Sequence, residues 1–158
     1  MGIGSIALAS IASFSLYAGR SVISLANYAE LESRSRLALD RMTQEIRQTR
    51  GLTDFTTSSL SFKDSDGAAL SYVYDPAAKT LARLKDGQRN VLLEECESLT
   101  FGVFQRNPIG GSYEVYPTAL PSTAKLIQVT WSCSRSILGA KVNSETVQLS
   151  RIVIRNHD

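Results

Sequence analysis

The chain has 158 residues, a length that suits one domain with an appended segment. Its 17 Lys and Arg residues nearly balance its 15 Asp and Glu residues, and no basic stripe with interleaved aromatic residues is visible, which argues against a nucleic-acid partner. The composition is ordinary for a globular protein, so the unusual feature is where the apolar residues lie along the chain.

The first 19 residues carry no charge, and the first charged residue is Arg20. Their length falls just short of the roughly 20 helical residues that cross a bilayer core of about 30 Å. A secretory signal peptide is disfavoured because a basic start and a small-x-small cleavage site are missing from the sequence. A buried core helix is disfavoured because the segment is rich in Gly, Ala and Ser and lacks a polar face. The favoured interpretation is a helix in a membrane or a protein bundle, since small residues let helices approach closely.

A second helical pattern follows directly, and we expect one helix from about Ile3 to Arg50, with Gly51 as its terminator. Opposite charges four residues apart support it. At 1.5 Å per residue the helix would be on the order of 70 Å long, so its first half must contact lipid or partner helices and its second half its own head. A helical stripe, apolar in its last turns and half polar in the middle, has residues alternately three and four apart: Leu25, Tyr28, Glu32, Ser35, Leu39, Met42 and Ile46.

After Gly51 the apolar period changes from 3.6 to 2, which predicts strands. The expected strands are Leu60–Lys63, Leu70–Tyr74, Thr80–Lys85, Gln88–Leu93, Leu99–Gln105, Lys125–Cys133 and Thr146–Arg155. Turn signals at Asp66-Gly67, Asp75-Pro76 and Asp86-Gly87 separate several of them. Because a second helix long enough for crossovers is missing from the pattern, we expect an antiparallel sheet. The fold class is therefore α+β, with a hydrophobic helix over residues 1–25 and a head over residues 26–158.

Candidate catalytic and metal-binding residues are few. His157 lies beside the C-terminus, where a frayed tail is the better interpretation. Asp64-Ser-Asp-Gly67 resembles part of a calcium loop, but the first and twelfth ligand positions fall on Phe62 and Val73, so a hairpin turn is favoured. Gly110-Gly111 lacks the Lys of a phosphate loop, and a tryptophan on a strand belongs to a core more often than to a ligand site.

Two further clusters are weighed in the same way. Glu94, Glu95 and Glu97 could pair carboxylates for acid–base chemistry, but a basic or nucleophilic partner is not near them in the sequence, so a solvated strand end is expected. Cys96 and Cys133 have no metal-ligand spacing. They could form a disulfide in an oxidising compartment or remain two buried thiols in the cytosol, and the spacing leaves both open.

Several short segments along the chain carry distinctive residue patterns. An Asp-Arg pair precedes an acidic-hydrophobic-Arg-Gln run in residues 37–50, and a Tyr-x-Tyr-Asp strand end in residues 70–76 precedes a Leu-x-Arg strand in residues 80–83. A proline-led strand over residues 120–131 and a closing strand over residues 151–156 follow. In this order the segments resemble the type IV pilin superfamily, above all the J-type minor pseudopilins of type II secretion and the W-type minor pilins of type IV pili.

The first residues depart from that family. The basic leader, the cleavage-site glycine and the Phe-Thr-Leu-Val-Glu that open its members are missing, and Met1-Gly-Ile-Gly resembles the stretch that comes later in them. Basic residues follow the apolar segment, which by itself would leave the head in the cytoplasm, and a basic leader upstream would remove the conflict. We expect either that the sequence omits these residues or that its start lies at an internal Met, and that prepilin peptidase does not process the chain as written.

The resemblance implies a structural subunit of a pseudopilus or pilus at or near the filament tip, not an enzyme, with no cofactor and no small-molecule substrate. It implies a single-pass helix in the bacterial inner membrane, a head in the periplasm or on the cell surface, and partners that are other pilin-like subunits. The expected helix-bundling residues are Gly4, Ile6, Ala7, Leu8, Ile11, Ala12, Phe14 and Leu16.

Two further expectations concern the head. The loop over residues 106–119, with Tyr113 and Tyr116, is the candidate partner contact, although a solvated loop is the commoner outcome for such a stretch. An exported head favours a disulfide between Cys96 and Cys133, with packed thiols as the alternative. The competing function is a membrane-anchored extracytoplasmic binding or adhesin module.

Overall fold

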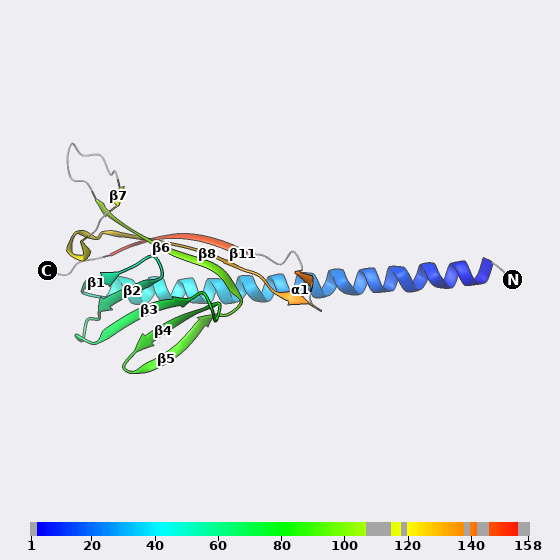
Figure 1. The fold of residues 1–158 in the computed structure, drawn as a ribbon, viewed down its shortest axis with the longest axis horizontal. Coiled ribbons are helices and arrows are strands. Elements are labelled where there is room, and N and C mark those ends of the chain that lie inside the picture. Colours follow the sequence, from blue (N-terminus) through cyan, green and yellow to red (C-terminus); the bar gives the residue numbers. More distant parts are fainter. Residues whose placement is uncertain (1–2, 107–114, 118–119, 138–139, 142–145, 155–158) are drawn as a thin grey trace.

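The computed structural model describes residues 3–106, 115–117, 120–137, 140–141 and 146–154, and for some of these, including 3–18, the backbone alone. One helix, α1 (Ile3–Gln48), runs without a break for 46 residues, about 70 Å at 1.5 Å per residue. Its second half lies against the sheets of the head (Figure 1). The expected α+β class, with one long helix on antiparallel sheet, is confirmed.

The strands of the described residues form two main antiparallel sheets instead of the single sheet expected. The first has the spatial order β1 (Gly51–Phe55), β2 (Ser59–Lys63), β3 (Ala69–Asp75), β4 (Thr80–Lys85) and β5 (Gln88–Leu93). The second has the order β11 (Thr146–Val153), β8 (Leu126–Cys133), β6 (Cys96–Arg106) and β7 (Val115–Pro117). The chain leaves the first sheet between β5 and β6, where Glu95 takes a left-handed φ of 56°.

Sequence reasoning missed several short elements. β1 lacks apolar alternation, since Leu52 is its buried residue and a bulge follows it. β7 lies within the loop expected over residues 106–119, and the small pair β9 (Ser136–Ile137) and β10 (Ala140–Lys141) lies between the last two expected strands. A single 3-10 turn, η2 (Pro121–Thr123), precedes β8.

The predicted hairpin turns are confirmed. Asp86 and Gly87 connect β4 to β5 with φ of 54° and 73°, the two positive values that a type I′ turn requires. Gly67, between β2 and β3, has φ of 83°. Asp75 closes the third turn, because its Oδ1 accepts hydrogen bonds from two backbone N–H groups that follow it.

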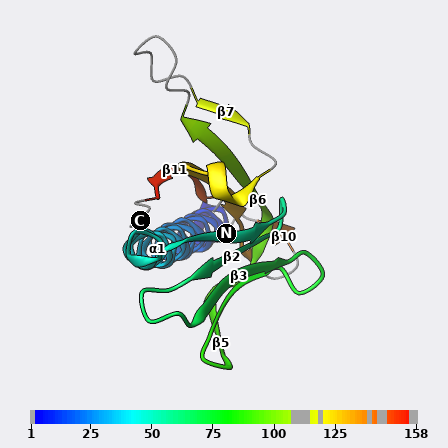
Figure 2. The same cartoon turned by 90° about the vertical axis from the view of Figure 1, so that its left-hand side faces the viewer.

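The helix packs between the two sheets, as the view along its axis shows (Figure 2). Its buried residues are Leu31, Ser35, Ala38, Met42, Ile46 and the following Thr49. The predicted stripe was right for Ser35, Met42 and Ile46, and Leu39 is partly buried against the core, but the stripe missed the buried Leu31 and Ala38. Two of the buried side chains of α1, those of Ser35 and Ala38, are small.

Trp131 on β8 is the largest fully buried side chain beside the helix. Its Nε1 donates a hydrogen bond of 3.3 Å to the Ser35 Oγ on α1. Residues of β8 alternate regularly between buried and half-buried positions, so that Ile127, Val129 and Trp131 point to the same side. The expectation that Trp131 belongs to the core is confirmed.

Candidate functional site

The first half of α1 projects well beyond the sheets (Figure 1). Its described apolar side chains are open to solvent: Val22 is 65% exposed, Ile23 52% and Leu25 70%. Leu25 closes the segment expected to bundle, and Tyr28, the next residue of the predicted stripe, is also 43% exposed. Contacts with the head are made further along, at Asn27 and Glu30. We call residues 3–26 the projecting half of α1.

The expected bundling residues, Gly4 to Leu16, lie on the backbone of this projecting half, and their side chains are outside the described part of the structure. Among the residues described, no helical stretch combines the length and apolarity that a membrane span requires. Their role in bundling stays a prediction.

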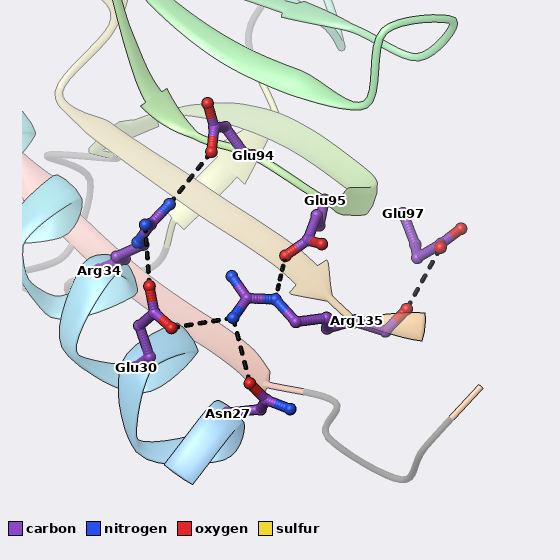
Figure 3. Close-up of polar contacts among 8 residues, drawn as sticks. Asn27, Glu30, Arg34, Glu94, Glu95, Glu97 and Arg135 are labelled. Carbon is purple, nitrogen blue, oxygen red and sulfur yellow. Dashed lines mark hydrogen bonds and ion pairs between the residues drawn. The ribbon is translucent and has the colours of Figure 1, made fainter. Parts of the chain in front are cut away.

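A cluster of charged side chains fixes the helix where it leaves the head (Figure 3). Arg135, just after β8, donates to the Glu30 Oε2 at 2.8 Å and to the Asn27 Oδ1 at 3.2 Å, both on α1. The same guanidinium donates to the Glu95 Oε2 at 2.7 Å. Arg135 therefore ties the helix to the connection between the two sheets. We call Asn27, Glu30, Arg34, Glu94, Glu95 and Arg135 the neck cluster.

A second arginine extends the neck cluster. Arg34 pairs with Glu30 at 2.8 Å and with Glu94 at 3.1 Å, so α1 is also linked to the end of β5. Hydrogen bonds from Arg135, and then the charges of Arg135 and Arg34, hold the pKa of Glu30 below its ordinary value. Glu30 therefore stays ionised in the folded state, and the cluster fixes the direction in which the projecting half leaves the head.

Replacing Arg135 with alanine is expected to loosen the neck with little effect on the fold. The pairs that it makes are partly exposed, so the thermal midpoint should fall by only about 2–4 °C. Amide hydrogen exchange over residues 25–34 should become faster, because the helix loses its link to the sheets there. Hydrogen-exchange mass spectrometry of the full chain measures residues 25–34 and the rest of α1 in one sample.

The matched control is Arg36→Ala. Arg36 pairs with Glu32 at 2.6 Å four residues away on the same helix, so its loss removes an exposed pair without changing the neck. Exchange over residues 25–34 that rises equally in both variants would show that Arg135 has no special role in holding the helix.

The acidic cluster was misread from the sequence. Glu94, Glu95 and Glu97 were expected to lack basic partners, but Arg34, Arg135 and Lys79 pair with them in turn, the last at 2.9 Å. These partners lie between 18 and 60 residues away in the sequence, where local spacing carries no signal. The cluster is therefore a set of ion pairs, in which Glu94 pairs with α1 directly, Glu95 is linked to α1 through Arg135, and Glu97 pairs with Lys79.

A second network, inside the head, was missed altogether. The Glu45 carboxylate on α1 accepts a hydrogen bond of 2.5 Å from the Tyr72 hydroxyl and one of 2.8 Å from the Arg83 Nε. Tyr72 is fully buried and Arg83 is only 8% exposed. The two side chains stand opposite each other on β3 and β4, so Glu45 joins α1 to the middle of the first sheet.

Other predicted candidates have structural roles or fall outside the described residues. Asp64 pairs with Lys85 and its backbone closes the turn before β3, which agrees with a hairpin interpretation. The backbone of Tyr116 lies in β7, opposite Gln105, and not in a loop as expected. Tyr113 and His157 lie outside the residues that the structure describes.

The two cysteines come together. Cys96 opens β6 and Cys133 closes β8, and the two residues are direct partners across the strand pair. Both are buried and are free thiols in the structure. The disulfide stays a prediction. Within the described residues, no group of three or more His, Cys, Asp or Glu side chains is placed to hold a metal ion.

The fold and its polar networks define a class: an α+β protein in which one long helix is clamped by a two-sheet head and projects from it. No protein-family model matches the chain, and a search of the curated proteins finds no match.

Proposed function

We propose that this chain is a structural minor subunit of a pilin-like filament, a type II secretion pseudopilus or a type IV pilus, and acts at or near the filament tip. In this proposal the projecting half of α1 lies in the inner membrane before assembly, with the head in the periplasm. It then packs against the corresponding helices of other pilin-like subunits. Lipid contacts are exchanged for helix contacts in that step.

The observation that carries the proposal is the unequal covering of one continuous helix. Between Leu31 and Ile46, α1 buries its inner side against its own head, while Val22, Ile23 and Leu25 are at least half exposed. Apolar side chains on a rigid helix are costly to leave in water, at about 25 cal/mol per Å² of apolar surface. A lipid or protein environment for the projecting half removes that cost.

The neck cluster and the Glu45 network support the same function. Ion pairs at Arg135 and Arg34 hold the helix where it leaves the head, and Glu45 holds it near its C-terminal end. Because these contacts lie at two places along one continuous helix, they fix the angle between α1 and the head. A subunit whose helix must align with neighbouring helices needs that angle to be constant, whereas a flexible tether would satisfy a simple membrane anchor.

The test uses cells that produce the full chain together with pilin-like subunits. Gly4→Leu and Ala12→Leu keep the projecting half apolar but remove small residues that allow close helix packing. Both variants are expected to stay in the membrane fraction and to disappear from sheared filaments. Ala29→Leu is the matched control, since it makes the same change at an exposed position alongside the head.

Membrane fractionation and filament recovery together separate the two candidate functions. An anchored binding or adhesin module would tolerate both bulky substitutions, because an anchor needs apolar length and not close packing. Normal filament incorporation of Gly4→Leu and Ala12→Leu, or incorporation of the chain into no filament at all, would overturn the proposal.

A further inference from the structure

The strand pairing around the two cysteines defines how close they are. Cys96 and Cys133 oppose each other across β6 and β8, and the next residue, Ser134, donates its N–H to the Glu95 carbonyl at 3.0 Å. The Cys96 N–H is directed elsewhere, to the Lys79 carbonyl at 2.9 Å. This is the hydrogen-bonding pattern of a non-hydrogen-bonded antiparallel pair, in which Cα atoms are about 4.5 Å apart and side chains approach most closely.

That spacing suits a covalent bond. Disulfides join residues whose Cα atoms are about 4.4–6.8 Å apart, and residues that face each other across a strand pair place their Cβ atoms on the same side of the sheet. Both side chains are buried on one side, at 0% and 1% exposure, beneath Ser35 of α1. The thiols therefore face each other in a closed site, where the Cys96 thiol also donates to the Ser98 carbonyl at 3.3 Å.

We propose that Cys96 and Cys133 form an intramolecular disulfide that fastens the start of β6 to the end of β8. The bond forms by two thiol–disulfide exchanges with an external disulfide, either of a protein oxidoreductase or of oxidised glutathione. One cysteine thiolate attacks that disulfide and releases one thiol, and the second cysteine then attacks the mixed disulfide and releases the other. Two protein thiols lose two electrons and two protons, and the external disulfide becomes two thiols.

The position of the bond gives it a role beyond stability. Glu95 precedes Cys96, and Arg135 lies two residues after Cys133, so the bond joins the two segments that the neck cluster uses to hold α1. Tyr74 adds a hydrogen bond from its hydroxyl to the Cys96 carbonyl at 3.0 Å. Oxidation therefore holds together the two backbone segments that carry Glu95 and Arg135. Because folding buries both thiols, the exchange takes place before or during folding.

The test refolds the full chain in detergent from the reduced, denatured state in a mixture of reduced and oxidised glutathione. Maleimide labelling under denaturing conditions then counts open thiols by intact mass. We expect the refolded monomer to accept no label until a reductant is added, whereas the reduced chain accepts two. The exchange equilibrium should favour the disulfide about 100-fold more in the folded chain than in denaturant, and oxidation should raise the thermal midpoint by about 5–10 °C.

Cys96→Ser and Cys133→Ser are the controls, each with one remaining thiol and a midpoint that does not respond to oxidation. Two open thiols in the refolded wild type, glutathione retained on one cysteine, or a bond between two chains would each overturn the proposal. A bond that forms equally well in denaturant, or one that leaves the midpoint unchanged, would also overturn it. These outcomes are independent of filament assembly, so they are distinguishable from a failure of the proposed function.

Discussion

Replacing Trp131 with alanine is expected to lower the free energy of unfolding by about 4 kcal/mol, because it removes a fully buried indole and leaves a cavity between α1 and the second sheet. The indole also satisfies the buried Ser35 hydroxyl through its 3.3 Å hydrogen bond. Thermal unfolding of the full chain, followed by circular dichroism, measures the loss, since the chain contains a single tryptophan and the variant has no indole fluorescence.

Trp131→Phe and Ser35→Ala divide this effect into packing and hydrogen bonding. Phenylalanine keeps most of the apolar bulk, and Ser35→Ala removes only the acceptor, so each should cost about 1–2 kcal/mol. Ser35→Leu should destabilise the head more than Ser35→Ala does, because a larger side chain overpacks the contact between helix and sheet. If Trp131→Ala were as stable as Trp131→Phe, apolar bulk at this position would not stabilise the packing of α1 on the second sheet.

The helix and most strands could be predicted because their signals are local. Period, turn chemistry and Gly51 defined α1 to within two residues at its C-terminal end, and Asp86-Gly87 defined a hairpin. The division into two sheets could not be predicted, because it depends on the left-handed backbone at Glu95, a residue type that does not require such a conformation. The predicted stripe of α1 included Ser35 but missed Leu31 and Ala38, which are buried in the structure.

The polar networks are where sequence reasoning failed. Tyr72 and Arg83 are 27 and 38 residues away from Glu45 in the sequence. The partners of Arg135 are up to 108 residues away from it. One signal was available for Arg83. It occupies an inward position of β4, and a charge facing a core requires an acidic partner, which α1 offers at Glu45, beside the stripe residue Ile46. Three segments that are separate in the sequence, residues 37–50, 70–76 and 80–83, thus meet at one carboxylate.

Replacing Glu45 with alanine is expected to cost about 3 kcal/mol, because it leaves the guanidinium of Arg83 and the hydroxyl of Tyr72 buried without their acceptor. Urea denaturation followed by Trp131 fluorescence measures the change. The matched control is Arg41→Ala. Arg41 pairs with the other oxygen of Glu45 at 3.3 Å but is half exposed, so its loss should cost less than about 1 kcal/mol. Equal losses in the two variants would exclude a buried charge as the cause.

The same carboxylate should make stability depend on pH. Burial alone would raise the pKa of Glu45, but hydrogen bonds from Arg83 and Tyr72 outweigh it and hold the pKa below its ordinary value of 4.5. A folded-state pKa below the unfolded one gives stability that is complete above the unfolded pKa and is lost as pH falls through the folded pKa. Between about pH 6 and pH 3 the wild type should therefore lose more stability than Glu45→Ala. Parallel pH profiles would mean that the charge of Glu45 does not stabilise the contact between α1 and the first sheet.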